Sequence, residues 1–360
     1  MNYVILNAYL ERNLGDDLFV KYLVQRYDNI KFYILDTTDK YIENSLNNLK
    51  IIDLENIKLI RILSWFYPSF IPNLKNLVKK NSKANIYIGG SLFIEYDNWN
   101  EITNWWDYQA NNYSFFVIGS NFGPYSSRDY KKRMNDIFSN CEDVCLRDQY
   151  SYNLFKENNN VRYAPDILLS YKMPKKRIRK QIFISTINCS KKDEGCNEIN
   201  DCQSLYESFL LDVIKEYLSK DYRIVLSSFC EQEGDNITIE NLIKSLNFPS
   251  NIEIINYDGF NSDDVLESIS SSSYIIASRF HATILALAAK RPVLPVIYSD
   301  KTKNVLEDMQ FKGNIIDIRN LKKHYTFDEI SQNMYLVQDM DKYVSKSEEH
   351  FLKLDEYLKK

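Results

Sequence analysis

Histidine is scarce in this sequence, because the 360-residue chain contains only three. The six cysteines form no CxxC pair, and no histidine is close to any of them; they are Cys141, Cys145, Cys189, Cys196, Cys202 and Cys230. This spacing does not match that of metal or redox sites, so we interpret the thiols as free and buried or half-buried. With no cluster of metal-ligand residues in the sequence either, we expect neither a metal nor a cofactor.

Two motifs that bind nucleotide phosphates are also missing. The sequence contains neither the GxGxxG fingerprint nor the GxxxxGK[ST] loop. An ordinary dinucleotide site or P-loop site therefore has no support.

The sequence has no apolar run long enough to span a bilayer. The longest apolar stretch, Ala282–Tyr298, is interrupted by two basic residues and two prolines. Residues 1–10 carry no basic leader and meet charged residues too early for a secretory segment, so we expect them to form a strand. We therefore expect a cytoplasmic protein.

Excess positive charge is absent as well, since the formal net charge is -4. A chain of this charge has no general attraction to nucleic acid, so we expect no nucleic-acid partner. An anionic ligand must be held by local positive charge.

What the sequence does contain is a regular alternation of short apolar runs with segments of helical period. This alternation predicts βαβ units and mostly parallel sheets. Clear helices are expected over 14–27 and 129–139. The expected strands are Tyr3–Leu6, Lys31–Leu35, Asn85–Ile88, Ser114–Ile118, Asp143–Leu146, Gln181–Ser185, Arg223–Ser227, Ile252–Ile255, Tyr274–Ala277, Val293–Ile297 and Asn314–Ile318.

The length predicts two domains of about 150 residues each with a cleft between them, and the alternation predicts that each is a doubly wound α/β domain. We place them at residues 1–172 and 173–330. The boundary lies in Tyr171–Lys180, which carries a proline and six basic residues and is either a solvated connector or a patch for phosphate or lipid headgroups.

Apolar spacing over 331–360 predicts a C-terminal helix that packs back across the domains. The region 41–72 is left unassigned, because its apolar runs fit strand or helix.

Ligands of open α/β sheets bind beyond the carboxyl ends of the strands, so unusual residues are sought there. After the first strand come Asn13, Gly15, Asp16 and Asp17. The glycine permits a tight turn, and the aspartates either cap the following helix or contribute to a site.

Small residues follow two further strands. Gly89, Gly90 and Ser91 bring backbone N–H groups close to anything bound there, which favours an anion cradle. The turn Gly119–Pro124 gives a second opening of the same kind.

The segment Ala277–Thr283, ASRFHAT, places Arg279 and His281 between a strand and a helix. A helix N-terminus and a fixed cation together favour a bound anion. His281 would then act as a general acid, although a half-buried histidine bonded to a backbone carbonyl is the alternative. Ser278 lies in the same turn, and Arg147, after another strand, is expected to point toward the same cleft.

Two further features have open interpretations. Lys301 follows a strand near the same edge and either contacts the ligand or is solvated. The aromatic residues that follow Gly90 either stack on sugar rings or fill the core; they are Trp99, Trp105, Trp106, Tyr108 and Tyr113.

Six segments together resemble the polysaccharide pyruvyl transferase family. In chain order they are NLGDD, IYIGGSLF, VIGSNFGP, LRDQYS, YAPDILLS and SRFHATILALAAKRPVLPVIYSDKTKN. The last block is the most specific, while each glycine loop alone would mean little. The resemblance covers most of residues 1–309.

This resemblance implies two Rossmann-like domains arranged as in GT-B glycosyltransferases. It implies transfer of the pyruvyl group of phosphoenolpyruvate to two hydroxyls of a sugar, which forms a cyclic ketal in capsule or exopolysaccharide biosynthesis. The acceptor would be a sugar or a lipid-linked oligosaccharide, with peripheral membrane contact through the basic segment Lys175–Lys180 as a further expectation.

The family's motifs map onto this sequence residue by residue. Arg279 and His281 match its Arg-x-His block, and Arg147 matches the arginine of its R-D motif. We take these three as catalytic candidates and add Ser278, Phe280 and Lys301 on the donor side. The acceptor candidates are Asn13, Gly15, Asp16, Asp17, Gly89, Gly90 and Ser91.

Two other functions remain open on the same fold. One is a GT-B glycosyltransferase that uses a nucleotide sugar, because a fold does not decide the chemistry. The other is a carbohydrate-binding protein without catalytic activity.

Overall fold

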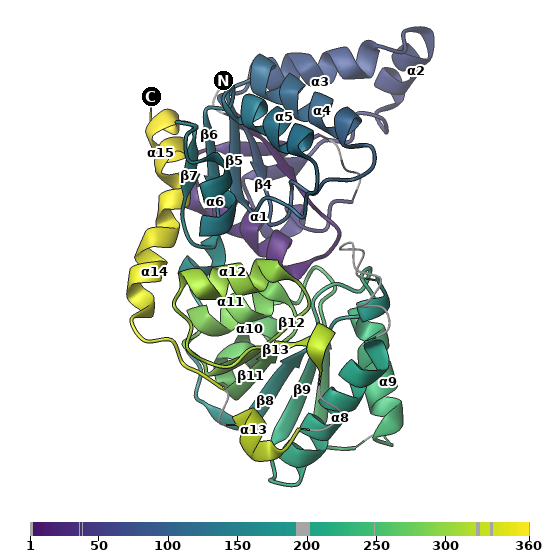
Figure 1. Cartoon of the computed structure of the whole chain (residues 1–360). Helices are drawn as coiled ribbons and strands as arrows, with labels where there is room; N and C mark the ends of the chain where they lie inside the picture. Colours follow the sequence, from purple (N-terminus) through teal and green to yellow (C-terminus); the bar gives the residue numbers. More distant parts are fainter. Residues whose placement is uncertain are drawn as a thin grey trace. The chain divides into compact units, whose positions relative to one another are not determined.

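The protein has two compact units, each built on a parallel sheet. The computed structural model describes residues 3–35, 37, 39–191, 202–247, 249–321, 325–331 and 334–359. The first unit comprises residues 1–10, 16–164 and 348–360, and the second comprises residues 11–15 and 165–347 (Figure 1).

The first unit contains a seven-stranded sheet with the order β3-β2-β1-β4-β5-β6-β7, and each neighbouring pair is parallel. Its strands are β1 Tyr3–Ala8, β2 Lys31–Ile34, β3 Leu49–Ile51, β4 Asn85–Ile88, β5 Phe115–Ser120, β6 Asp143–Leu146 and β7 Val161–Tyr163. Its helices are α1 Leu14–Arg26, which starts within residues of the second unit, η1 Glu43–Ser45, α2 Lys58–Phe66, α3 Phe70–Lys80, α4 Trp99–Asn112, α5 Arg128–Phe138, α6 Gln149–Phe155, η5 Glu348–Phe351 and α15 Leu352–Leu358.

Helices cover both faces of this sheet, which explains why the inner strand β5 is buried at every residue. Alternate residues of β5 point to opposite faces. Phe115 joins the buried cluster that includes Trp106 of α4 and Met134 of α5. Phe116 instead contacts the ring of Tyr357 in α15, with the ring centroids 5.2 Å apart.

The second unit contains a six-stranded parallel sheet with the order β10-β9-β8-β11-β12-β13. Its strands are β8 Arg179–Ser185, β9 Arg223–Ser228, β10 Ile252–Asn256, β11 Ser272–Ala277, β12 Val293–Ile297 and β13 Ile316–Asp317. Its helices are η2 Ile167–Ser170, η3 Cys189–Lys191, α8 Gln203–Leu218, α9 Asp235–Ser245, α10 Ser262–Ser271, α11 Phe280–Ala288, α12 Asp300–Asp308, η4 Ile318–Asn320, α13 Phe327–Ser331 and α14 Met340–Ser347. Figure 1 shows α8 and α9 on one face of this sheet and α10 and α11 on the other.

Each sheet has one point where the strand order reverses. It lies between β1 and β4 in the first unit and between β8 and β11 in the second. In doubly wound sheets the carboxyl ends of the strands at such a point leave a crevice that binds ligands. The fold therefore indicates where to look in each unit.

The predicted parallel, doubly wound α/β architecture is confirmed, and each expected strand overlaps an observed one. The sequence pattern does not predict β3 and β7, which have three residues each and lie at the edges of the first sheet. The unassigned region 41–72 contains η1, β3 and α2.

The division of the chain differs in detail from the predicted one. The units change between Ala164 and Pro165, ahead of the predicted boundary at residue 172. The basic segment Tyr171–Lys180 therefore belongs to the second unit, where the Lys176 ammonium lies 2.7 Å from Glu267. Glu11–Gly15, predicted in the N-terminal domain, also belongs to the second unit, because Leu14 N donates to the Phe229 carbonyl at 3.1 Å.

The C-terminal segment 331–360 is not one helix. In its described part α14 belongs to the second unit, where the Tyr343 hydroxyl donates to the Met309 carbonyl at 2.8 Å. The chain returns to the first unit at Glu348, and Phe351 and Leu354 are fully buried there. The 3-10 turn η5 separates the two helices because their apolar faces pack on different units.

Candidate functional site

The strand-order reversal in the second unit holds a tightly bonded turn. Ser185 ends β8, and its Oγ accepts hydrogen bonds from the backbone N–H of Ser278 at 2.9 Å and of Arg279 at 3.2 Å. The Tyr206 hydroxyl donates to Ser278 Oγ at 2.7 Å. These bonds fix the chain between β11 and α11, where the predicted donor residues lie.

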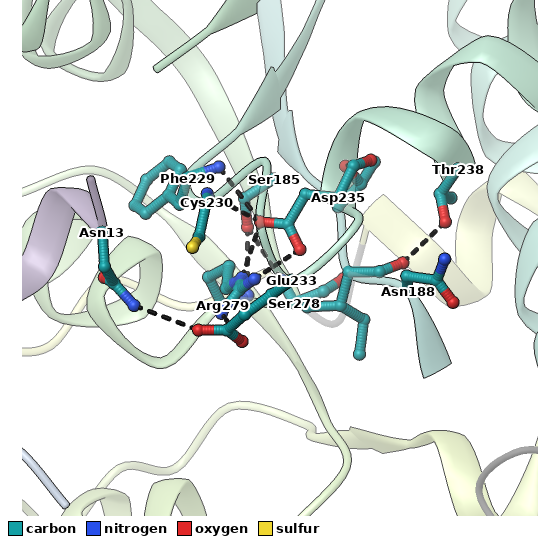
Figure 2. Close-up of polar contacts among 12 residues, drawn as sticks. Asn13, Ser185, Asn188, Phe229, Cys230, Glu233, Asp235, Thr238, Ser278 and Arg279 are labelled. Atoms are coloured by element: carbon teal, nitrogen blue, oxygen red, sulfur yellow. Dashed lines mark hydrogen bonds and ion pairs between the residues drawn. The ribbon is translucent and has the colours of Figure 1, made fainter. Parts of the chain in front are cut away.

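Arg279 is buried and bound to two carboxylates (Figure 2). Its Nε and Nη2 donate to Asp235 at 2.7 and 2.5 Å, and its Nη1 donates to Glu233 Oε2 at 2.6 Å. Asp235 Oδ2 also accepts from the backbone N–H groups of Phe229 and Cys230, both at 3.1 Å. The arginine is thus tied to the loop between β9 and α9.

The two carboxylates determine the electrostatics of Arg279. Burial disfavours its charge, but Asp235 and Glu233 raise the pKa of the guanidinium well above its usual range. The positive charge is compensated within the protein, so Arg279 contributes geometry more than net attraction for an anion.

The segment that precedes α1 completes this cluster. Asn13 Nδ2 donates to Glu233 Oε1 at 3.3 Å, and Asn13 Oδ1 accepts from the backbone N–H of Gly15 at 3.1 Å. Two predicted acceptor residues, Asn13 and Gly15, are therefore joined to the predicted donor residue Arg279 through Glu233.

His281 lies in the first turn of α11 with its ring directly against Gly15. A Cβ atom placed on Gly15 would be only 1.7 Å from His281 Nδ1. The ring also meets Phe280 edge to face, with the centroids 5.0 Å apart. The glycine is therefore required here for close approach, and the imidazole packs against both Gly15 and Phe280.

A second helix begins beside α11, at the end of the neighbouring strand β12. Helix α12 has no side-chain cap at Ser299, and Ser299 Oγ is buried without a hydrogen-bond partner among the described residues. Lys301 lies in its first turn, with the ammonium 5.3 Å from the centroid of the Tyr298 ring. Two helix N-termini with partial positive charge thus adjoin at the carboxyl edge of this sheet.

The first unit has a cluster of its own, built around Arg147. This arginine is almost fully buried, and its Nη2 donates to Asn121 Oδ1 at 2.7 Å. A Cβ atom on Gly90 would lie 2.8 Å from Arg147 Nη1, so that glycine makes room for the guanidinium. Ser91 Oγ donates to the same Asn121 oxygen at 3.2 Å. The predicted residues Gly90, Ser91 and Arg147 are therefore together, and Arg279 and His281 belong to the other unit.

The remaining acceptor candidates of the first unit have mainly structural contacts. Asp17 is buried and accepts a hydrogen bond from the Tyr41 hydroxyl at 2.5 Å, whereas Asp16 is half-buried. Both lie in the first turn of α1, where negative charge favours the helix. A Cβ atom on Gly89 would meet only the flexible end of Leu92.

The aromatic residues after Gly90 divide between core and surface. Trp106 and Tyr113 are buried, and Trp106 stacks on Tyr87 with the ring centroids 4.9 Å apart. Trp105 and Tyr108 of the same helix are exposed.

Sequence reasoning missed several residues of these clusters. They are Ser185, Tyr206, Glu233, Asp235, Ser299 and Asn121. One signal was available, because the polar stretch CEQEGD directly follows β9 at the carboxyl edge of the sheet. Nothing in the neighbouring sequence indicated that Glu233 and Asp235 of this stretch pair with Arg279.

The cysteines that the structure describes are free thiols. Burial raises the pKa of Cys141 to about 12 and that of Cys230 to about 11. Cys196 lies outside the described residues. Within the described ranges no three acidic, histidine or cysteine side chains gather to hold a metal ion, and no helix is long and apolar enough to cross a membrane.

Comparison with protein families identifies one match that covers most of the chain. The family model for polysaccharide pyruvyl transferase matches residues 13–300. The match includes both clusters, from Asn13 to Ser299.

Solved structures of other proteins share the fold. HepE from Anabaena in complex with UDP has a TM-score of 0.59 at 9% identity, with 100% of each chain covered. UDP-GlcNAc 2-epimerase from Neisseria meningitidis bound to UDP-GlcNAc has a TM-score of 0.56 at 11% identity, over 99% of this chain and 100% of that one. TarM from S. aureus, in complex with fondaparinux, alpha-GlcNAc-glycerol and UDP, has a TM-score of 0.53 at 12% identity, with 100% of each chain covered. At such identities the likeness concerns the fold alone, and the predicted pair of GT-B-like α/β domains is confirmed.

Proposed function

Because the chain belongs to the polysaccharide pyruvyl transferase family, we propose that it transfers the pyruvyl group of phosphoenolpyruvate to two hydroxyls of a sugar. The product is a cyclic ketal on a capsule or exopolysaccharide precursor. The reaction takes place in the cytoplasm and requires no cofactor beyond the donor.

The observation that carries this proposal is the Arg-x-His turn at the strand-order reversal of the second sheet. Phosphoenolpyruvate has a carboxylate and a phosphate, and the adjoining N-termini of α11 and α12 offer partial positive charge to two anionic groups. Ser299 Oγ, buried without a described partner, and Lys301 supply additional donors at the start of α12. Ser278 and Phe280 shape the turn that presents His281.

The chemistry needs one group that gives and accepts protons. The imidazolium protonates the methylene carbon of phosphoenolpyruvate, and a sugar hydroxyl attacks the neighbouring carbon and gives its proton to the imidazole, which restores the acid. The C–O bond to phosphate then breaks, and the second hydroxyl attacks the same carbon and gives its proton to the departing phosphate. His281 is the candidate, since an imidazole exchanges protons near neutral pH and this ring is held in place by Gly15 and Phe280.

Arg279 and Arg147 have different roles in this proposal. Arg279 is a positioning residue, because Asp235 and Glu233 occupy its donors and tie α11 to the loop after β9. Arg147 is a buried cation of the first unit, where its Nη2 donates to Asn121 and Gly90 leaves room for the guanidinium, and it is a candidate for holding an anionic group in that unit.

Of the acceptor candidates, Gly90, Ser91 and Asp16 keep that role in the first unit, and Asn13 keeps it in the second. Gly89 is left out because a Cβ atom there would meet only Leu92, and Asp17 is left out because it is buried and bonded to Tyr41.

Thermal unfolding with candidate donors tests the proposal. A ligand that binds only the folded state stabilises it by about 2.7 kcal/mol at 100 times its Kd. We expect phosphoenolpyruvate to raise the Tm, and UDP and UDP-GlcNAc to leave it unchanged. Stabilisation by the nucleotide sugar alone would instead favour a glycosyltransferase, in keeping with the UDP complexes among the similar structures.

His281→Gln separates binding from chemistry. Phosphoenolpyruvate should still raise the Tm of this variant, while phosphate release in the presence of an acceptor should fall by at least about 100-fold. Arg279→Ala is a poor test, because it leaves Asp235 buried without its cation. Saturable sugar binding with no phosphate release from any donor would favour the non-catalytic alternative.

A further inference from the structure

The segment between β3 and β4 has a charge pattern unlike the rest of the chain. Residues 57–94 contain no aspartate or glutamate, although the whole chain has a net charge of -4. The basic residues of this segment are Lys58, Arg61, Lys75, Lys79, Lys80 and Lys83. Helices α2 and α3 are therefore a cationic feature of an acidic protein.

Helix α2 leaves an apolar face in water. None of its nine side chains, all of which are described, is buried. The exposed fractions of its large apolar side chains are 67% for Leu59, 46% for Ile62, 80% for Trp65 and 65% for Phe66. Tyr67, which follows the helix, is 65% exposed. Most proteins cover side chains of this kind, so such a patch indicates an interaction surface.

The order of residues in α2 places these side chains on one side. At 100° per residue, Leu59, Ile62 and Phe66 share a face, and Trp65 and Lys58 flank it. Arg61 lies on the opposite side, while Ile60 and Leu63 are half-buried. The helix therefore presents a stripe of large apolar groups, with Lys58 beside it and Arg61 on the opposite, polar side.

The hairpin of α2 and α3 is anchored to the first unit through α3. The Tyr3 hydroxyl donates to the Val78 carbonyl at 2.7 Å, and the Tyr113 hydroxyl donates to Asn76 Oδ1 at 2.8 Å. Figure 1 shows α2 at the tip of this unit, with α3 leading back to it. The apolar surface continues into a groove of about 630 Å³ whose lining includes Ile71, Pro72, Trp105 and Tyr108. Lys75 and Glu55 also line this groove, and the Lys75 ammonium lies 4.0 Å from the Glu55 carboxylate.

We propose that α2 and the start of α3 dock this protein onto an anionic phospholipid bilayer. A short amphipathic helix with Trp, Phe and Leu on one side and Lys or Arg beside them is the usual structure that lies in the membrane interface. Trp65 and Tyr67 suit the headgroup level, where amphipathic rings are enriched. Lys58, Arg61 and Lys80 are exposed and add electrostatic attraction to anionic lipids. The positive charge of residues 57–94 complements an anionic bilayer, whereas an interface with a protein partner or a second copy would not require charge of a single sign.

Docking of this kind also indicates a class of acceptor. A sugar carried on a lipid is concentrated at the same surface, so docking would favour the lipid-linked form of acceptor among those that the family resemblance implies. This second step depends on the proposed pyruvyl transfer, whereas the docking itself does not.

Co-sedimentation with vesicles tests the docking. Wild-type protein is mixed with phosphatidylcholine vesicles that contain about one third phosphatidylglycerol, and with vesicles of phosphatidylcholine alone. We expect binding to the anionic vesicles that weakens with salt. The double variant Trp65→Ser/Phe66→Ser should bind roughly 10-fold or more weakly, and Lys58→Glu/Arg61→Glu should lose a similar factor.

Matched controls exist in the second unit. Phe260 is 61% exposed, so Phe260→Ser removes an equally exposed aromatic side chain and should bind vesicles as the wild type does. Lys175→Glu/Arg177→Glu reverses two charges in the exposed basic segment that the sequence analysis singled out, and it should also leave binding unchanged. Loss of binding in this control and not in the α2 variants would move the docking surface to that segment and overturn the proposal.

Two further outcomes would overturn it. The first is vesicle binding that is absent in the wild type or unchanged in the α2 variants. The second is self-association of the wild type, measured by sedimentation velocity, without any vesicle binding. If the α2 variants abolish that self-association, α2 joins two copies of the chain. Phosphate release with a soluble acceptor is measured in parallel, and the α2 variants should retain it. A failure of that activity in the wild type would contradict the proposed function and leave the docking result intact.

Discussion

At the scale of single residues, Gly15 and His281 depend on each other. The ring of His281 occupies the space where any other residue at position 15 would place its Cβ atom. We predict that Gly15→Ala displaces the imidazole by at least about 1 Å and lowers turnover by roughly 100-fold, because catalytic groups tolerate little misplacement. Steady-state phosphate release would measure this, with circular dichroism to verify the fold.

Gly89→Ala is the matched control for that substitution. Its new methyl group would meet only the end of the Leu92 side chain, which can rotate away. Turnover close to wild type in Gly89→Ala and a large loss in Gly15→Ala would place His281 in the reaction. Equal rates in both variants would argue that the imidazole has no catalytic part.

A second residue-scale prediction concerns the carboxylate that holds Arg279. Asp235 is fully buried and accepts from the guanidinium and from two backbone N–H groups. Asp235→Asn leaves a buried arginine without its main counter-charge, which costs about 3–5 kcal/mol of unfolding free energy. Urea unfolding followed by circular dichroism would measure this. The exposed pair of Arg223 and Glu253 supplies the comparison, because Glu253→Gln should change stability by less than about 1 kcal/mol.

The sequence predicted the turn that carries Arg279 and His281 because its signal is local. A strand, two polar residues and an apolar helix follow one another in seven residues, from Ala277 to Thr283. The partners of Arg279 had no such signal. Asp235 lies 44 residues earlier and meets the arginine only because β9 and β11, the strands that precede the two residues, both pair with β8.

At the scale of elements, α15 is fastened to α1 by a small polar network. Arg26 donates to Asp355 at 2.7 Å, and the Tyr27 hydroxyl donates to the same carboxylate at 2.6 Å. Burial opposes the charge of Asp355, but these hydrogen bonds lower the pKa of its carboxyl below the ordinary 3.8. The element is therefore held by a contact that acid removes.

We predict that Asp355→Asn lowers the unfolding free energy by about 2 kcal/mol at pH 7, the usual value for hydrogen bonds to a charged group. A carboxyl whose pKa is lower in the folded than in the unfolded protein stabilises the fold fully at pH values above its pKa in the unfolded chain. This stabilisation is lost as the pH falls through its pKa in the folded protein. The difference between wild type and variant should therefore shrink below about pH 4. Urea titrations at several pH values would follow it. Asp341→Asn, which breaks an exposed pair with Lys290, should show no such dependence.

Elements were predictable where their residues are buried on both faces. The apolar runs of β4, β6 and β12 match the predicted strands to the residue. The edge strands β3 and β7 are too short to form a pattern, and α2 shows apolar residues that the unit does not bury. Periodicity alone cannot separate such a surface helix from a core element.

At the scale of the whole molecule, the first unit is discontinuous in sequence and is completed by residues 348–360. A chain that ends before Glu348 would lack Phe351 and Leu354, which are fully buried. Burial of each such side chain contributes about 1.5–3 kcal/mol, and the contacts of Arg26 with Glu348 and Asp355 would be lost too. We predict that this truncation destabilises the first unit by about 5 kcal/mol or more and leaves the second unit folded.

The tryptophans make this prediction measurable. All four, at positions 65, 99, 105 and 106, lie in the first unit, so fluorescence follows that unit while circular dichroism follows both. The truncated chain should lose the fluorescence transition or show it at a lower temperature, with a circular dichroism transition that persists. A chain that ends after Leu358 is the control. Simultaneous loss of both transitions would contradict independent stability of the second unit.

The number of units followed from chain length, but their membership did not. The assignment of Glu11–Gly15 to the second unit depends on contacts of Asn13 and Leu14 with the loop after β9. The return of the chain at Glu348 depends on Arg26 and Tyr27, more than 300 residues earlier. Long-range pairings of this kind leave no periodic trace in a single sequence.

The discontinuity of the first unit also sets an order of events during translation. Residues 165–347 are synthesised before η5 and α15, so the strands of the second sheet exist while the first sheet still lacks its last cover. At about 5–20 residues per second, the nascent first unit waits roughly ten seconds or more with the surface that later packs on Phe351 and Leu354 unprotected. The unit that begins first is thus completed last, and this interval is when the nascent chain has most need of a chaperone.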